Sequence, residues 1–278
     1  MLRLRVITAL ALVIPFLLSL TVKSQLPFAL FTLVFIAAAG WEWGRLNAAA
    51  GAGPVLMGVL LALACAAAVA ADWITEAPSA AWWTATALWL VGGTVALRGG
   101  PAGWPHLPKF ARWVLGLVAL WVAWLAMGHA RAIGINFMLS IFCLVWMADV
   151  AAYFGGRAFG KRKLAPSISP GKSWEGVWSG MAGVLLLAAL WQWIDRTFGV
   201  DGPSLDSHLA RVAGQAGMAV VLLVLCGFSV VGDLFESLVK RAAGAKDSSR
   251  LLPGHGGVLD RIDALLPVFP AALALAWM

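Results

Sequence analysis

Residues 54–71 read "PVLMGVLLALACAAAVAA", without a single charged side chain. A bilayer core about 30 Å thick is crossed by roughly 20 apolar residues in an α-helix, so this run predicts a membrane-spanning helix. Comparable runs recur along the whole chain of 278 residues. We interpret about nine stretches as spans, at residues 4–22, 26–44, 54–71, 80–97, 111–129, 132–153, 174–195, 212–234 and 264–278.

The composition agrees with this interpretation. Only 12% of the residues are charged and 62% are hydrophobic, whereas soluble domains carry roughly 25% charged residues. No polar run is long enough to form a separate soluble domain. We therefore expect an all-α, polytopic integral membrane protein, with residues 1–278 in a single transmembrane domain. The net charge of +7 requires no nucleic-acid partner, because loop charges facing an anionic inner leaflet account for it.

The positive charges predict an orientation. Nine spans place the N-terminus and the loops after spans two, four, six and eight on one side, which holds sixteen of the twenty lysines and arginines. The other side holds Lys23, Arg131, Arg196 and Arg211. Because cytoplasmic loops are enriched in Lys and Arg, the first side is predicted to be cytoplasmic and the C-terminus external. We expect a multi-pass protein of the cytoplasmic (inner) membrane, with the chemistry of residues 149–263 on the cytoplasmic side.

The first polar cluster spans 148–176 and reads "ADVAAYFGGRAFGKRKLAPSISPGKSWEG". Asp149 lies near the end of a predicted span, where an ionisable group is costly unless it has a partner or a function. Ser173, followed by Gly176 and Gly180, suits a helix N-terminus that offers N–H groups to an anion. The basic residues 161–163 have a simpler alternative, which is anchoring at the cytoplasmic face.

The second cluster spans 229–241 and places carboxylates at the inner end of a span. Asp233, Glu236 and Lys240 are spaced to share one helix face. A salt-bridged helix end is the alternative, and it explains one carboxylate more easily than two.

The third cluster, residues 246–263, reads "KDSSRLLPGHGGVLDRID". Carboxylates from separate segments bind Mg²⁺ through hard oxygen ligands, usually with phosphate oxygens completing the shell. Lysines and arginines beside them hold the remaining phosphate charge. The three clusters together indicate phosphoryl or nucleotidyl transfer at the membrane. His255 is interpreted as a donor to phosphate, with a general base or a loop hydrogen bond as alternatives.

Residues 237–263 resemble the signature of phosphatidate cytidylyltransferases, also called CDP-diacylglycerol synthases. The shared landmarks are a serine, Lys-Arg, Lys-Asp, Pro-Gly-His-Gly-Gly and a closing Asp-Arg-x-Asp. "SPGKSWEG" (169–176) and "GDLFES" (232–237) resemble two further stretches of the family. Ser173 stands where the family has threonine, which keeps the hydroxyl. The N-terminal half resembles the family only as a series of apolar spans.

The resemblance implies a Mg²⁺-dependent reaction in which CTP and phosphatidic acid give CDP-diacylglycerol and pyrophosphate. A second cation is left open. Together with carboxylate chemistry, the resemblance implies a metal site built from Asp233, Asp260 and Asp263, with Glu236 and Asp247 as further candidates. Phosphate contacts in catalysis are expected from Lys240, Arg241, Lys246 and His255. Nucleotide or lipid phosphate is expected to meet Ser169, Lys172, Ser173, Gly256, Gly257 and Arg261.

The resemblance also implies a homodimer in the lipid bilayer. The small residues Gly176, Gly180 and Gly183 suit close helix packing, either between two copies or within one chain. Other functions remain open at this stage. They are a CTP-dependent kinase of prenols or other lipids, a cytidylyltransferase of another lipid phosphate, and an ion-coupled transporter. Crowding of the ionisable groups at one face, with no internal repeat, argues against the transporter.

Overall fold

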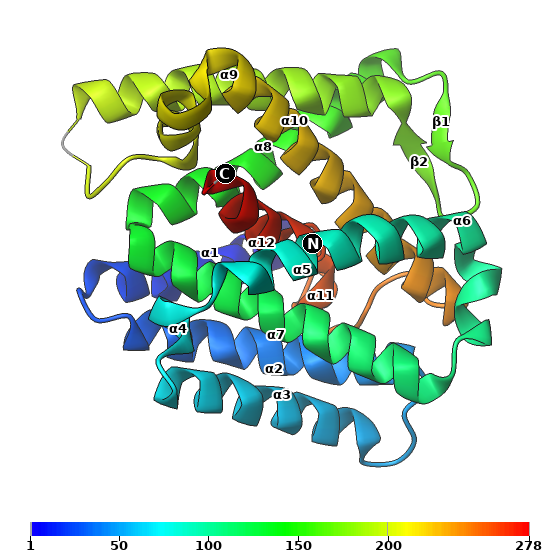
Figure 1. Ribbon diagram of the computed structural model, residues 1–278. Helices are drawn as coiled ribbons and strands as arrows, with labels where there is room; N and C mark the ends of the chain where they lie inside the picture. Colours follow the sequence, from blue (N-terminus) through cyan, green and yellow to red (C-terminus); the bar gives the residue numbers. More distant parts are fainter. Residues whose placement is uncertain (1, 199, 278) are drawn as a thin grey trace.

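The computed structural model describes residues 2–198 and 200–277, and their side chains from residue 7 onward (Figure 1). Within these residues the structure is almost entirely helical. The α-helices are α1 (Leu2–Thr21), α2 (Leu26–Leu46), α3 (Gly53–Ala70), α4 (Trp73–Glu76), α5 (Ser79–Leu88), α6 (Thr94–Gly103), α7 (Lys109–Ile133), α8 (Ile135–Phe159), α9 (Trp174–Thr197), α10 (Leu205–Ala242), α11 (Leu259–Ile262) and α12 (Leu265–Ala276). A π-helical turn, Trp89–Gly93, joins α5 to α6, and a 3₁₀ turn, Trp104–His106, follows α6.

Seven helical stretches of the described chain are long and apolar enough to cross a membrane. They correspond to the second through eighth predicted spans, which confirms an all-α polytopic membrane protein. The first predicted span forms α1, whose segment Ile7–Thr21 is apolar but shorter. The bounds of the seven stretches are Leu26–Leu46, Gly53–Ala70, Ser79–His106, Lys109–Ile133, Ile135–Phe159, Trp174–Thr197 and Leu205–Ala242.

The last predicted span, 264–278, differs from the expectation. It forms α12, a helix of 12 residues, which at 1.5 Å per residue covers only about 18 Å of the bilayer core. All of its residues except Leu275 are buried, and it lies in the middle of the bundle against α5, α7, α8 and α10 (Figure 1). A helix that is apolar all round is compatible with a protein core as well as with lipid, so composition alone did not separate the two.

Contacts join segments that the sequence assigns to the same side, either in loops or near the ends of predicted spans. At one end of the bundle, Trp104 Nε1 donates to Asn47 Oδ1 at 2.9 Å, and Thr8 Oγ1 donates to the carbonyl of Pro253 at 2.9 Å. At the other end, Arg131 Nη2 donates to the carbonyl of Val22 at 3.1 Å. The grouping of the loops therefore agrees with the prediction, and the direction of the bundle in the membrane stays a prediction.

A short β-hairpin, absent from the sequence-based expectation, connects α8 to α9. Strand β1 (Lys163–Ala165) pairs antiparallel with β2 (Ser169–Ser173). Ser173 ends β2 and is also the N-cap of α9, because its Oγ accepts the backbone N–H of Gly176 at 3.2 Å. The predicted helix start at Ser173 is thus confirmed, and the hairpin fixes Lys172 just before it.

The glycines of α9 pack against α8 within the same chain. A Cβ built on Gly180 would lie 2.9 Å from the carbonyl oxygen of Ala148, and one on Gly183 would lie 2.7 Å from Ala151 Cβ. Only glycine allows α8 and α9 to run side by side this closely (Figure 1). Of the two alternatives for these small residues, the structure uses packing within one chain.

Gly183→Val is expected to lower the free energy of unfolding by about 1–3 kcal/mol, because the new side chain overlaps α8. The thermal unfolding midpoint of the purified protein in detergent measures this. Gly227→Val is the matched control, since a Cβ at Gly227 of α10 meets nothing within 4 Å. Equal midpoints for the two variants would contradict the close α8–α9 contact.

Candidate functional site: an acidic cavity at the end of α10

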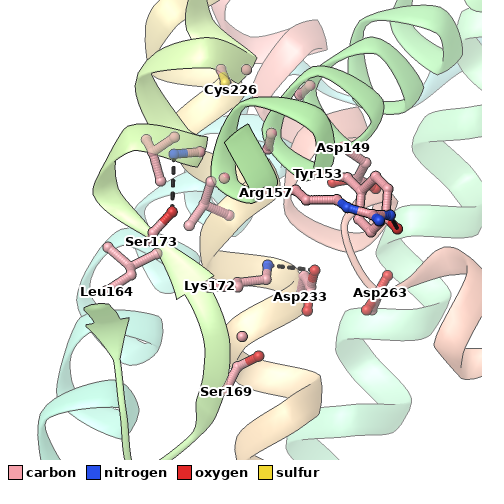
Figure 2. A pocket seen from close by; sticks show the side chains of 18 of the residues that line it. Asp149, Tyr153, Arg157, Leu164, Ser169, Lys172, Ser173, Cys226, Asp233 and Asp263 are labelled. Carbon is pink, nitrogen blue, oxygen red and sulfur yellow. Dashed lines mark hydrogen bonds and ion pairs between the residues drawn. The ribbon is translucent and has the colours of Figure 1, made fainter. Parts of the chain in front are cut away.

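A cavity of about 760 Å³ opens where the end of α8, the hairpin, the start of α9, the second half of α10 and the segment around α11 converge (Figure 2). Its polar lining combines carboxylates with cationic and hydroxyl groups. The lining residues that carry such groups are Asp149, Tyr153, Arg157, Ser169, Lys172, Ser173, Asp233, Asp260, Arg261 and Asp263. The cavity therefore brings together residues from all three polar clusters of the sequence.

The face of α8 that lines the cavity follows the helical repeat. Asp149, Ala152, Tyr153, Gly156 and Arg157 occupy positions i, i+3, i+4, i+7 and i+8. The guanidinium of Arg157 lies 3.3 Å from the hydroxyl of Tyr153. Tyr153 and Arg157 were not among the predicted site residues, although this spacing counted from Asp149 was the signal that would have found them.

Lys172 and Asp233 form an ion pair across the cavity (Figure 2). Lys172 comes from β2 and Asp233 from α10. Both side chains are 27% exposed, so they are accessible to solvent. Ser237, one helical turn further along α10, lies with its Oγ 3.4 Å from Asp233 Oδ1. The structure thus places the ammonium group of Lys172 and the carboxylate of Asp233 together on the cavity wall, with the Ser237 hydroxyl behind the carboxylate.

Lys240 links two carboxylates deeper in the wall. Its Nζ lies 2.5 Å from Glu236 Oε2 and 2.6 Å from Asp260 Oδ1. The i, i+4 pair with Glu236 is the salt bridge that the sequence left as an alternative. Asp260 comes from α11, so this lysine also joins the end of α10 to the third polar cluster.

The carboxylate of Asp260 accepts hydrogen bonds from Lys240, Ser248 and Gly257. Its Oδ2 accepts the N–H of Gly257 at 2.8 Å, and the N–H and hydroxyl of Ser248 at 3.0 and 2.9 Å. Burial opposes ionisation, but the hydrogen bond and positive charge of Lys240, followed by contacts with Glu236 and the N–H of Gly257, lower the pKa of Asp260 to about 2. Asp260 is therefore ionised at neutral pH.

Asp263 has the opposite electrostatic environment. Burial raises its pKa above the ordinary value, and the nearby charge of Asp233 raises it further. Its Oδ1 accepts the N–H of Ala264 at 2.7 Å. Figure 2 shows the carboxyl groups of Asp233 and Asp263 facing the same part of the cavity. An added cation between them would favour the ionised form of both.

The donor set of the cavity fits Mg²⁺. Among residues 2–198 and 200–277, no group of three or more His, Cys, Asp or Glu side chains lies close enough together to hold a metal ion by itself. Mg²⁺, however, is usually bound by one or two carboxylates, with water and substrate phosphates completing its shell. Asp233, Asp260 and Asp263 all line the cavity, so one or two of them would supply the carboxylate oxygens in such an arrangement.

Several predicted site residues lie outside the cavity lining. These are Glu236, Lys240, Arg241, Lys246, Asp247, His255, Gly256 and Gly257. Glu236 and Lys240 remain connected to it through Asp260. The guanidinium of Arg241 instead donates to the carbonyls of Ile168 and Ala245, at 3.4 and 3.1 Å. Their predicted contacts with phosphate or metal stay predictions.

The "PGHGG" run is explained by backbone geometry. Gly254 and Gly256 have φ of 79° and 84°, a left-handed conformation that glycine adopts without steric cost. The carbonyl of His255 accepts from Arg261 Nε and Nη2 at 3.0 and 2.6 Å, so Arg261 closes the turn. The imidazole Nδ1 of His255 is buried and has no hydrogen-bond partner among the described residues. The observed role of Gly254 and Gly256 is therefore to form the turn of this loop.

Comparison with known proteins identifies the family to which the chain belongs. The model of the cytidylyltransferase family matches residues 3–278. A curated phosphatidate cytidylyltransferase from Pseudomonas aeruginosa is 39% identical over 290 residues, covering 100% of this chain and 97% of the relative. Relatives of the same name from Haemophilus influenzae and Brucella melitensis are 47% and 45% identical over 137 and 145 residues. Those alignments cover 49% and 52% of this chain, and 44% and 47% of the relatives. The chain therefore belongs to the cytidylyltransferase family.

Proposed function

We propose that this enzyme transfers the cytidylyl group of CTP to phosphatidic acid, giving CDP-diacylglycerol and pyrophosphate. The observation that carries the proposal is the acidic cavity with Lys172, Asp233, Asp260 and Asp263 on its wall. It is supported by the 39% identity to a phosphatidate cytidylyltransferase along the whole chain. The cavity lies at the end of several membrane helices, where a lipid phosphate and a water-soluble nucleotide can meet.

The chemistry requires positioning and charge screening more than proton removal. An oxygen of the lipid phosphate attacks the α-phosphorus of CTP, and the bond from that phosphorus to the oxygen bridging to the β-phosphate breaks. Pyrophosphate leaves with the electron pair. Because the second pKa of a phosphate monoester is about 6, the nucleophile already carries the charge it needs near neutral pH. No histidine lines the cavity within the described residues, which suits a nucleophile of this kind.

The side chains of the cavity have complementary roles in this proposal. Mg²⁺, when bound, screens the triphosphate and stabilises the charge that develops on the leaving pyrophosphate. Asp233, Asp260 and Asp263 would hold it. Lys172 and Arg157 line the same cavity and would bind phosphate oxygens. Lys240 neutralises the negative charge of Glu236 and Asp260 through its two ion pairs.

Product analysis tests the reaction. The purified protein in detergent is incubated with α-phosphate-labelled CTP, phosphatidic acid and Mg²⁺, and the lipids are extracted. Label in the lipid fraction and pyrophosphate in water are expected, and excess EDTA should stop both. Release of labelled CDP would instead identify a CTP-dependent lipid kinase. Omission of phosphatidic acid, or its replacement by another lipid phosphate, identifies the acceptor.

We further infer that the cavity faces the cytoplasm, since the loops grouped around it hold most of the lysines and arginines. In a variant with the three native cysteines replaced by alanine, Ala71→Cys is expected to react with a membrane-impermeant thiol reagent added to spheroplasts. Lys163→Cys is expected to react only after permeabilisation. Both positions are exposed in the structure. The reverse pattern would contradict the orientation.

The homodimer is also part of this proposal, and it rests on the family resemblance. Since the glycine face of α9 is occupied by α8, a dimer must use another surface. Light scattering with the detergent contribution subtracted is expected to give twice the chain mass of 29.3 kDa.

A further inference from the structure

Glu42, near the end of α2, is fully buried at 0% exposure, and four donor groups of one distant loop lie within hydrogen-bond distance of its carboxylate. Ser249 Oγ and Val258 N donate to Oε1 at 2.5 and 2.9 Å. Ser248 Oγ lies 3.2 Å from Oε2, and Leu259 N donates to the same oxygen at 2.6 Å. The donors are more than 200 residues away in sequence, so these contacts belong to the tertiary structure alone.

The four donors come from both ends of the loop that carries the "PGHGG" turn. Residues 248–249 precede the turn, and residues 258–259 follow it and begin α11. A single carboxylate therefore clamps the base of the loop. Gly257 completes the clamp, because a Cβ at this position would overlap both Ser248 Oγ and the Glu42 carboxylate.

The clamp is directly connected to the cavity wall. Asp260 follows Leu259, and its Oδ2 accepts from Gly257 N and from the N–H and hydroxyl of Ser248. The Ser248 hydroxyl has one proton and lies between Glu42 and Asp260, so it donates to only one of them at a time. On the opposite side, Gly232 of α10 leaves room for the backbone of Asp263, since a Cβ there would lie 2.5 Å from the Asp263 carbonyl oxygen. The segment 260–263 is thus fixed between α2 and α10.

We propose that Glu42 is a positioning residue, which holds Asp260 and Asp263 at the cavity by clamping the loop through Ser248, Ser249, Val258 and Leu259. This inference rests on the proposed function, because it assigns to Asp260 and Asp263 the binding of a divalent cation. Glu42 itself does not line the cavity. Its effect on the cation would pass through the loop, as with the outer-shell carboxylates that orient metal ligands elsewhere.

Glu42→Gln is the principal variant, because it keeps the shape of the side chain. Each carboxylate oxygen of Glu42 faces one hydroxyl and one backbone N–H, so the amide NH₂ would meet donors in either orientation. Binding of Mn²⁺, used in place of Mg²⁺ and without substrate, is measured by electron paramagnetic resonance. We expect the Kd for Mn²⁺ to rise about 10- to 100-fold, and trypsin to cleave faster after the exposed Arg250 of the loop.

Two further variants separate positioning from general stability. Ser248→Ala removes the residue between Glu42 and Asp260, whereas Ser249→Ala removes a Glu42 contact that does not reach Asp260. The first should weaken Mn²⁺ binding more than the second. Glu76→Gln, at an exposed carboxylate of α4, is the matched control and should leave Mn²⁺ binding, cleavage and activity unchanged.

A lower thermal midpoint for Glu42→Gln with an unchanged Kd for Mn²⁺ would overturn the proposal, since Glu42 would then only stabilise the fold. If Glu42→Gln does not fold, the same two measurements are made on Ser248→Ala, and a lower thermal midpoint with an unchanged Kd for Mn²⁺ would again overturn the proposal. Failure of the proposed function looks different, because the unmodified protein would then make no CDP-diacylglycerol. If the unmodified protein binds no Mn²⁺, the trypsin measurement decides, and equal cleavage of Glu42→Gln and the unmodified protein would overturn the clamp.

Discussion

Asp263→Asn is expected to lower kcat for CTP turnover by about 10²- to 10³-fold, the loss typical of removing one group that stabilises transition-state charge. Asp263 lines the cavity beside Asp233, and its charge is the part of the side chain that a cation would use. Asparagine keeps an oxygen for the N–H of Ala264, which Asp263 Oδ1 accepts at 2.7 Å. The fold should therefore survive while the reaction is lost.

The measurement combines steady-state turnover with the thermal midpoint in detergent. Asp72→Asn is a matched control, because Asp72 is an exposed residue far from the cavity in a left-handed conformation that asparagine tolerates. It should behave like the unmodified protein in both measurements. Near-normal turnover by Asp263→Asn would remove this residue from the proposed metal site.

Lys240→Met is expected to destabilise the protein by about 3–5 kcal/mol, because breaking a buried ion pair leaves its partners uncompensated. The lysine side chain is 12% exposed, and its partners Glu236 and Asp260 are 2% and 7% exposed. Without Lys240, two carboxylates would face each other in a partly apolar wall. Turnover should fall as well, since Asp260 would lose the contact that ties it to α10.

Arg241→Met is the control for Lys240→Met, because this adjacent cation donates to the carbonyls of Ile168 and Ala245 and pairs with no carboxylate among the described residues. Thermal midpoints of the two variants give the comparison. Adding Glu236→Gln to Lys240→Met removes one of the uncompensated charges and should restore part of the stability without restoring activity. If Lys240→Met and Arg241→Met have equal thermal midpoints, the ion pairs of Lys240 with Glu236 and Asp260 contribute little to the stability of the protein.

The positions of the membrane spans were largely predictable because each span is a local property of its own residues. Seven of the expected spans reappear as helices of sufficient length, since roughly 20 apolar residues specify a crossing wherever they occur. The helix start at Ser173 was predictable for a similar reason, because an N-cap hydroxyl acts on a backbone N–H three residues away. The hairpin Lys163–Ser173 was missed, since its strands are short and lack an alternating apolar pattern.

The site was predictable in its chemistry and only partly in its geometry. Asp233, Asp260 and Asp263 were expected together, and all three line one cavity. His255 and Arg241 belong to the same motif, yet neither residue lines the cavity. Their positions depend on the left-handed turns at Gly254 and Gly256 and on the contacts around Ile168, which residue identity alone does not specify.

The sequence by itself determined that this is a helical membrane protein, because hydropathy acts locally, and its charges and residue types predicted that the chemistry resides in residues 149–263. The tertiary structure decided that α12 is buried within the bundle, that Lys240 joins Glu236 to Asp260, and that Glu42 of α2 holds the loop of the third cluster. These outcomes depend on which surfaces pack together in the folded chain, and for Glu42 the contacts join residues more than 200 positions apart. A buried carboxylate needs donors in place of water, and only the folded chain shows which donors it receives.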